Sequence, residues 1–304
     1  MRLGVAATPP VALPTLDWLL SSGHELARVI TQPDRPAGRG RAMRESVVGQ
    51  WATEHGVPVL KPGKPEDLLE KLGDLDLVIT IGYGVILPET VLSIPKFGFI
   101  NLHFSHLPAW RGAAPVAHAI LNGDAITGVS VFKLDAGMDT GPIFVSREIA
   151  IGSQESAGEL LQRMAEVGPE VVAEALELIA EGLVPTVQSA DGVSYATKIH
   201  KEDARIDWTK SATVLDRQVR AFTPEPGAWT LWRGQPLQIS KAHPAIPEAP
   251  LQAGEISLLA GSLFVGCAAG EALQVEKLRP AGKKEMAATQ WFNGARVLAG
   301  ELFV

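Results

Sequence analysis

The sequence is poor in cysteine, with one in 304 residues, and this scarcity excludes whole classes of site. A single cysteine cannot close an intramolecular disulfide or supply several thiolates to a metal ion. Cys267 lies in the apolar run Phe264–Ala268, which is typical of a strand. We therefore interpret Cys267 as a buried structural thiol and not as a nucleophile.

Long apolar runs are also absent. None approaches the roughly 18 apolar residues that a membrane span requires. The apolar part of Met1–Pro10 is too short for a signal sequence and is broken by proline. With 46% hydrophobic and 20% charged residues, the chain can build a sizeable core in one large or two modest domains. We expect a cytoplasmic protein with no membrane partner, and these features are consistent with a monomer.

Cations are in the minority, since 27 Lys and Arg stand against 34 Asp and Glu, for a formal net charge of −7. This balance argues mildly against nucleic acid as a partner. The exception is the segment 35–44, whose ten residues include Arg35, Arg39, Arg41 and Arg44. Its glycines and proline predict a shaped loop after a strand. Such a loop is either a solvated surface feature or a contact for phosphates and unpaired bases.

Short apolar runs alternate with helical patterns in the first part of the chain. Strands separated by helices predict an α/β fold with a doubly wound, mainly parallel sheet. In the last helical pattern, Gly168–Pro169 marks a point at which the helix can break. The strands are predicted at 3–7, 26–31, 77–81, 99–103, 128–134 and 143–149, and the helices at 13–22, 46–55, 113–121 and 156–181.

The composition changes near residue 190, where a polar stretch with few apolar residues begins. Beyond it, short apolar runs separated by turn residues predict a small β-barrel. We therefore divide the chain into a first domain at 1–189, a linker at 190–206 and a second domain at 207–304. The strands of the second domain are predicted at 227–232, 237–242, 254–259, 263–267 and 272–278.

The strand predicted at 99–103 ends in the strongest candidate for chemistry. Asn101 and His103 are two residues apart, so their side chains share one face of the strand. They come at the carboxyl end of a strand, where parallel sheets bind ligands. A later loop offers two carboxylates, Asp135 and Asp139. The same residues can equally be a structural hydrogen-bond pair and a turn.

Acyl transfer between amines matches this set without a metal ion or a nucleophilic side chain. A neutral amine attacks a carbonyl, the oxyanion needs donors, and one nitrogen loses the proton that the other gains. Asn101 can donate to the oxyanion, and His103 can donate as well or shuttle a proton. A nearby carboxylate can orient the imidazole and accept a proton if burial raises its pKa.

Longer motifs around these residues resemble a known family. Asn101-Leu102-His103, Ser105 and the stretch Leu107–Pro115 resemble the signature of the 10-formyltetrahydrofolate-dependent formyltransferases, and Asp135–Gly141 resembles that family's second loop. The resemblance spans nearly the whole chain. Three further stretches are similar to the branch of the family that acts on methionyl-tRNA, namely Thr31–Gly40, Ala204–Trp208 and Leu278–Lys284.

The resemblance implies a Rossmann-like formyltransferase domain followed by a C-terminal barrel of the oligonucleotide-binding (OB) type. It implies that Asn101, His103 and Asp139 form the catalytic set and that no metal takes part. The co-substrate is then 10-formyltetrahydrofolate, and the acceptor is the α-amino group of methionyl-initiator tRNA. The implied folate contacts are Tyr83, Ile86, Leu87, Ser105, His106, Leu107, Pro108 and Asp135. The implied tRNA contacts are Arg35, Arg39, Arg41, Arg44, Lys283 and Lys284.

The chain departs from the family pattern at three positions. Ala7 stands where glycine is usual, and Met138 stands where leucine is usual, which conserves volume. His106 replaces a leucine of the folate loop. His106 can add a polar contact or face solvent, and we favour the solvent-facing interpretation.

Three other functions compete with transfer to methionyl-tRNA. The same domain can formylate a small acceptor, such as an amino sugar nucleotide or a purine precursor. It can also give the formyl group to water as a hydrolase. The chain can also be a non-catalytic tRNA- or folate-binding protein, which an intact Asn101, His103 and Asp139 disfavours. The arginine-rich segment and the second domain favour a tRNA acceptor.

Overall fold

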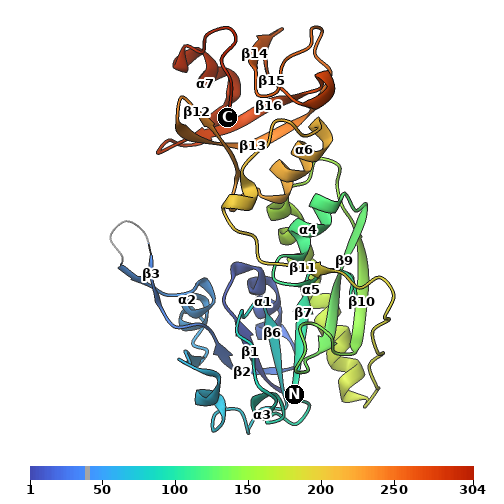
Figure 1. Ribbon diagram of the computed structural model, residues 1–304. Helices are drawn as coiled ribbons and strands as arrows, with labels where there is room; N and C mark the ends of the chain where they lie inside the picture. The colour runs from blue at the N-terminus through green and yellow to red at the C-terminus, as the bar shows by residue number, and fades with distance from the viewer. Residues whose placement is uncertain (38–41) are drawn as a thin grey trace. The chain divides into compact units, whose positions relative to one another are not determined.

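The computed structural model describes residues 1–37 and 42–304, and these residues form two compact units (Figure 1). Each unit is assembled from separate stretches of the chain, so the proposed boundaries at 1–189, 190–206 and 207–304 stay a prediction. Within the described ranges, no helix is long and apolar enough to cross a membrane. The first unit comprises Met1–Pro115, Ile126–Ala150 and Leu161–Thr197, and the second comprises Val116–Ala125, Ile151–Leu160 and Lys198–Val304.

A seven-stranded sheet forms the centre of the first unit, in the order β10-β9-β7-β6-β1-β2-β5. All neighbours from β7 to β5 run parallel, whereas β9 and β10 are antiparallel. The mainly parallel sheet predicted from the sequence is therefore confirmed. The strands are β1 (Arg2–Ala7), β2 (Glu25–Ile30), β5 (Val59–Leu60), β6 (Leu77–Ile81), β7 (Phe99–His103), β9 (Ile126–Lys133) and β10 (Ile143–Ala150).

The central strands are apolar along their whole length because both faces of the sheet are covered. Every residue of β6 is buried. The helices of this part of the chain are α1 (Leu13–Ser21), α2 (Val47–Glu54), α3 (Glu89–Leu92), α4 (Pro115–Asn122) and α5 (Ala157–Ala180). Ser46 caps α2, because its hydroxyl accepts a hydrogen bond from the backbone N–H of Gly49 at 2.9 Å.

Helix α5 runs unbroken through Gly168–Pro169, so the break considered from the sequence does not occur. A side chain at residue 168 would meet Leu102 at 2.9 Å and the Thr15 hydroxyl at 3.0 Å. Glycine therefore lets this helix pack closely against the sheet. Proline removes one backbone hydrogen bond from the helix, and close packing compensates for that loss.

Two short strand pairs lie outside the large sheet in the first unit. The pair β3 (Arg35–Ala37) and β4 (Ala42–Arg44) is antiparallel and places Arg35 opposite Arg44. The pair β8 (Arg111–Gly112) and β11 (Tyr195–Ala196) is parallel. Short 3-10 turns occur at Pro10–Ala12, Pro65–Leu68, Glu202–Ala204 and Ala268–Gly270.

The second unit contains an antiparallel sheet in the order β12-β13-β16-β15-β14, with β17 paired to β16. Val304 exchanges two backbone hydrogen bonds with Leu231 of β12, and the carbonyl of Glu301 accepts one from Ile256 of β14. One short segment thus contacts both outer strands. The elements are α6 (Ala212–Ala221), β12 (Ala228–Trp232), β13 (Gln235–Ala245), β14 (Ile256–Leu259), β15 (Ser262–Gly266), β16 (Ala272–Pro280), β17 (Met286–Ala287) and α7 (Ala288–Ala295).

Cys267 lies directly after β15 and is 2% exposed. Burial raises the pKa of its thiol to about 11. We expect the native protein at pH 8 to resist a thiol reagent such as dithionitrobenzoate, because the thiolate is both scarce and covered. The same measurement in guanidinium chloride should release one equivalent per chain. Rapid labelling of the native protein would contradict this account of Cys267.

Candidate active site

A cavity of about 480 Å³ opens where β6 and β7 end side by side. Its walls come from these two strands, from residues 82–87 and from residues 134–139. The structure places Asn101, His103 and Asp139 together in this lining. The same lining includes Tyr83, Ile86, Leu87 and Asp135, but not Ser105, His106, Leu107 or Pro108.

Asn101 is held by a neighbour on the adjacent strand. The hydroxyl of Thr80, whose register partner is Asn101, donates to Asn101 Oδ1 at 2.6 Å. The carboxamide is therefore oriented with its oxygen toward β6. No described residue accepts from the Asn101 amide nitrogen, which leaves two N–H donors available to a ligand in the cavity.

His103 is buried, and one of its ring nitrogens is occupied. Nε2 lies 3.1 Å from the carbonyl oxygen of Trp110. Because a carbonyl only accepts, Nε2 carries the proton and Nδ1 of the neutral ring holds a lone pair. Burial lowers the pKa of His103, although the Asp139 carboxylate opposes that shift. The ring is therefore neutral at neutral pH, with a basic nitrogen ready to accept a proton.

Asp139 presents its carboxylate to the same nitrogen. Oδ2 lies 3.8 Å from His103 Nδ1, which is beyond hydrogen-bond distance, and accepts a hydrogen bond from the backbone N–H of Gly112 at 2.7 Å. Asp139 has a φ of 53°, in the left-handed region that costs a non-glycine residue free energy. The loop therefore holds a strained residue so that the carboxylate faces the imidazole.

The loop after β7 turns away from the cavity and is hydrogen-bonded to β9. Ser130, which is fully buried, donates to the carbonyl of Ser105 at 2.8 Å and accepts from the N–H of Leu107 at 3.1 Å. His106 is half-buried, and its Nδ1 lies 3.1 Å from the Ser146 hydroxyl. His106 therefore makes a polar contact with the Ser146 hydroxyl while its ring stays partly exposed to solvent.

The residues predicted to contact folate on the other wall differ in exposure. Leu87 is buried and burial raises the pKa of Tyr83, whereas Ile86 is 84% exposed at the mouth of the cavity. Asp135 Oδ1 accepts from the N–H of Gly137 at 3.0 Å and from the hydroxyl of Thr140 at 2.8 Å. One Asp135 oxygen thus shapes its own loop and leaves the other for a ligand.

The predicted tRNA contacts fall in three places. Arg35 and Arg44 pair across the β3–β4 hairpin, and Arg39 and Arg41 lie outside the described residues. In the second unit, Lys283 lines a hollow of about 370 Å³ whose other polar or aromatic lining residues are Lys201, Trp229, Gln238 and Arg279. Lys284 is exposed next to it.

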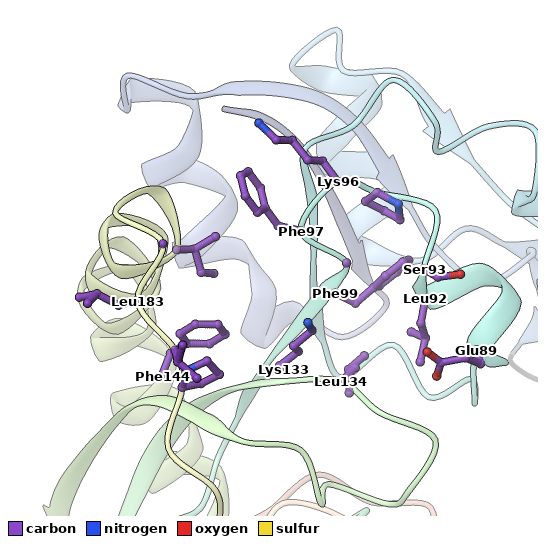
Figure 2. Close-up of a pocket in the computed structure, with 16 residues that line it drawn as sticks. Glu89, Leu92, Ser93, Lys96, Phe97, Phe99, Lys133, Leu134, Phe144 and Leu183 are labelled. Carbon is purple, nitrogen blue, oxygen red and sulfur yellow. The ribbon is translucent and has the colours of Figure 1, made fainter.

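A second cavity of the first unit, of about 550 Å³, lies near the start of β7 (Figure 2). Phe97, Phe99 and Phe144 line it together with two lysines, Lys96 and Lys133. It shares Leu92 and Leu134 with the first cavity but contains none of the three candidate catalytic residues. We therefore place the chemistry in the first cavity.

The described part of the chain contains no group of three or more His, Cys, Asp or Glu side chains that could hold a metal ion. Two supporting residues escaped the sequence analysis. Thr80 is the one polar residue within the apolar strand β6, a signal that could have been used. Gln188 donates to the carbonyls of Asp139 and Gly141 at 2.8 Å each, and nothing in its polar neighbourhood marks it.

Comparison with known proteins gives full-length matches. Residues 4–176 match the formyl transferase family, and residues 198–296 match the formyl transferase C-terminal domain. The methionyl-tRNA formyltransferase of Thermobifida fusca is 44% identical over 308 residues, covering 100% of this chain and 99% of that relative.

Solved structures with a similar fold share less sequence. HypX from Aquifex aeolicus, in complex with tetrahydrofolic acid, has a TM-score of 0.69 at 19% identity, and the match covers 96% of this chain and 46% of HypX. The N-formyltransferase from Helicobacter canadensis, in complex with folinic acid and dTDP-3-aminofucose, has a TM-score of 0.69 at 18% identity, covering 90% of this chain and 98% of that one.

Proposed function

The chain belongs to the formyl transferase family of formyl-transferring enzymes, and we propose that it formylates the α-amino group of methionyl-initiator tRNA for translation initiation, with 10-formyltetrahydrofolate as donor. The observation that carries this proposal is the juxtaposition of Asn101, His103 and Asp139 in one cavity, within a chain similar along its full length to methionyl-tRNA formyltransferases.

Direct attack on the formyl carbon needs only the groups that this cavity offers. The amine nitrogen forms a bond to the formyl carbon, a tetrahedral oxyanion results, and the bond from that carbon to the folate nitrogen then breaks. The free N–H donors of Asn101 are the candidate oxyanion donors, because Thr80 already holds the carboxamide oxygen. The hydrogen bonds from these donors strengthen as negative charge develops on the formyl oxygen, and this strengthening lowers the barrier to formyl transfer.

His103 is the candidate carrier of the proton that the attacking amine loses. Its Nδ1 holds the lone pair, and burial keeps the ring neutral. The Asp139 carboxylate at 3.8 Å stabilises the imidazolium that forms. The proton then passes to the departing folate nitrogen, so charge and atoms balance over one turnover.

The cavity fits the co-substrate in size and character. Its volume of about 480 Å³ lies within the range of small-molecule sites. Leu87 supplies apolar surface inside, Ile86 offers an exposed apolar contact at the mouth, and Asp135 has a free oxygen for a pterin N–H. The contacts proposed for the segment 105–108 stay a prediction, since none of its residues lines the cavity.

For the tRNA we propose that the arginine-rich segment 35–44 contacts the acceptor end and that the second unit binds phosphates. We also propose that the second unit is a barrel of the OB type. Support comes from the antiparallel sheet and from the segment 301–304, which hydrogen-bonds to both outer strands. A cytoplasmic, monomeric state is part of the same proposal, because the sequence offers no sign of an alternative.

Removing the proposed phosphate contacts should weaken tRNA binding and leave folate use intact. We expect Arg39→Ala with Arg41→Ala, and separately Lys283→Ala with Lys284→Ala, each to lower the slope of log Kd against log salt by about 2, or roughly one per cation. The measurement is tRNA binding between 50 and 200 mM salt, with Lys96→Ala as the control. An unchanged slope in both double variants would remove these residues from the tRNA site.

A formyl-transfer assay tests the proposed function itself. Purified protein and 10-formyltetrahydrofolate are supplied with methionyl-initiator tRNA, elongator methionyl-tRNA, free methionine or an amino sugar nucleotide. Transfer to the initiator species alone supports the proposal. Folate consumption without formylated tRNA would instead favour a hydrolase, and transfer to the sugar would favour a small acceptor.

A further inference from the structure

We propose that Gln188 positions Asp139 for formyl transfer, and that the buried guanidinium of Arg111 holds Gln188 in the orientation this requires. The inference rests on the proposed function, because it assigns Asp139 a part in that reaction. All of the residues involved belong to the first unit. Neither Gln188 nor Arg111 lines the cavity, so both act through Asp139.

Arg111 is unusual in being 9% exposed with a neutral partner. Its Nε and one terminal nitrogen lie 3.1 and 2.7 Å from Gln188 Oε1. No carboxylate of residues 1–37 or 42–304 lies within ion-pair distance of its guanidinium. Burying a cation without a carboxylate partner costs free energy. We infer that the contact between Arg111 and Gln188 has a positioning role that outweighs this cost.

That positioning role follows from the hydrogen bonds that the amide nitrogen of Gln188 makes. Its Nε2 donates to the carbonyl oxygens of Asp139 and Gly141, at 2.8 Å each. A guanidinium only donates, so Gln188 must turn its oxygen toward Arg111 and its NH₂ group toward the two carbonyls. The cation also polarises the amide, which strengthens both of the outgoing hydrogen bonds.

Asp139 needs such support because its backbone is strained. Its φ of 53° is disfavoured for an L-residue, and left to itself the loop would relax toward ordinary backbone angles. Gly112 N–H holds the carboxylate, whereas Gln188 holds the peptide on either side of the turn. Relaxation would carry the carboxylate away from His103 Nδ1.

The segment that carries Gln188 also reaches the histidine. The Ser194 hydroxyl accepts from the N–H of Trp110 at 2.9 Å, and the Ser194 carbonyl accepts from the N–H of Arg111 at 2.9 Å. The carbonyl of Trp110 is the partner of His103 Nε2. One stretch of chain from Gln188 to Ala196 therefore fixes both the imidazole and the carboxylate that faces it.

Gln188→Glu separates positioning from general stability. The glutamate keeps an oxygen on Arg111 and forms an ion pair with it, so the fold keeps this contact. It cannot donate to the carbonyls of Asp139 and Gly141, and instead repels them. We expect kcat for formyl transfer to fall roughly 10- to 100-fold, as misplacement of a catalytic group does. The KM values for folate and tRNA should change less than about twofold, and the melting temperature should not fall.

The pH profile gives a second, independent readout. The ionisable side chains of the cavity lining are Tyr83, His103, Asp135 and Asp139. Because the Asp139 carboxylate raises the pKa of His103, displacing that carboxylate lowers it. The acid limb of kcat should therefore move to lower pH in Gln188→Met, which releases the carboxylate without adding a charge.

Gln218→Glu is a matched control in the second unit. Gln218 is also half-buried, and its Nε2 donates to two backbone carbonyls, those of Asp203 and Arg205, at 3.1 and 3.0 Å. The same chemical change there should leave kcat within about twofold of wild type, since Gln218 lies outside the catalytic cavity.

The outcomes distinguish the two proposals. A wild-type protein that transfers no formyl group overturns the proposed function and this inference with it. An active wild type with unchanged kcat in Gln188→Glu and an unchanged pH profile in Gln188→Met overturns the positioning role alone. A loss of kcat in Gln188→Glu and in the isosteric Gln188→Met that only follows a falling melting temperature also overturns it, in favour of a purely structural contact.

Discussion

His103→Ala is expected to lower kcat of formyl transfer by about 10²- to 10⁴-fold, the range for loss of a positioned acid–base group. The variant removes the Nδ1 lone pair, which lies beside the Asp139 carboxylate, and leaves that carboxylate without its imidazole partner. Single-turnover rates with formyl donor and methionyl-initiator tRNA are the direct measurement. His200→Ala, at an exposed histidine of the second unit, is the control and should behave as wild type.

The pH dependence of wild-type activity, and of the stability of wild type and His103→Ala, gives a second test of this expectation. Burial lowers the pKa of His103, so the neutral ring persists below the usual pKa of about 6.5 and wild-type activity should fall only at more acidic pH. Unfolded His103 binds a proton at higher pH than the folded form does. Wild type should therefore lose stability as pH drops below about 6.5, and His103→Ala should lose less. Near-normal turnover in His103→Ala would remove the residue from the catalytic set.

Asn101→Ala is expected to cost about 10²- to 10³-fold in kcat, as the loss of an oxyanion donor does. The deletion removes the N–H donors that Thr80 leaves free by holding the carboxamide oxygen. Because these donors act mainly in the transition state, the KM for the folate donor should change little.

Asn101→Asp is the matched variant for this second expectation. It keeps the size of the side chain but replaces the donors with a carboxylate oxygen, so it should be at least as slow as Asn101→Ala. Thr80→Val should give a smaller loss, because it frees the carboxamide to rotate without removing it. Equal, wild-type rates in Asn101→Ala and Asn101→Asp would place the oxyanion donor elsewhere.

The sheet of the first unit was predictable because strands that are buried on both faces consist of continuous apolar runs, which are visible in the sequence. The strands predicted at 77–81 and 99–103 coincide with β6 and β7. The spacing of Asn101 and His103 on a strand end then placed two of the three candidate catalytic groups. Asp139 needed the family resemblance, since an aspartate in a glycine-rich turn has a structural explanation of its own.

Helices α6 and α7 escaped the sequence analysis because they are short, with ten and eight residues, and their few apolar positions were not recognised as helical. Helix α6 buries Leu215 and Val219 but is otherwise built largely from polar residues and alanine. Its N-cap, Ser211, accepts from the N–H of Val214 at 3.4 Å, and serine is a preferred residue at this position. Such a helix is fixed by its packing against the sheet, and tertiary packing is not visible in a local window.

Gln188 was beyond reach for a different reason. It is 49 residues from Asp139 in the sequence and lies in a polar stretch without periodicity. Its importance arises from two carbonyl oxygens that a loop brings within 2.8 Å of its amide. The stretch 190–206, which we interpret as a linker, also contributes to the first unit, because Tyr195–Ala196 forms strand β11 against Arg111–Gly112.

That pairing of β11 with β8 bears on how chimeras of this chain with its relatives should be spliced. A crossover at residue 190 would draw Ser194 from one parent and Trp110 from the other, although the two residues share a hydrogen bond beside His103. Recombinants joined there combine the segment 190–197 of one parent with the loop around Trp110 of another, and these two segments did not evolve together. A crossover after Thr197 keeps both in one parent, so an exchange of the C-terminal stretch of the second unit between relatives should begin at residue 198.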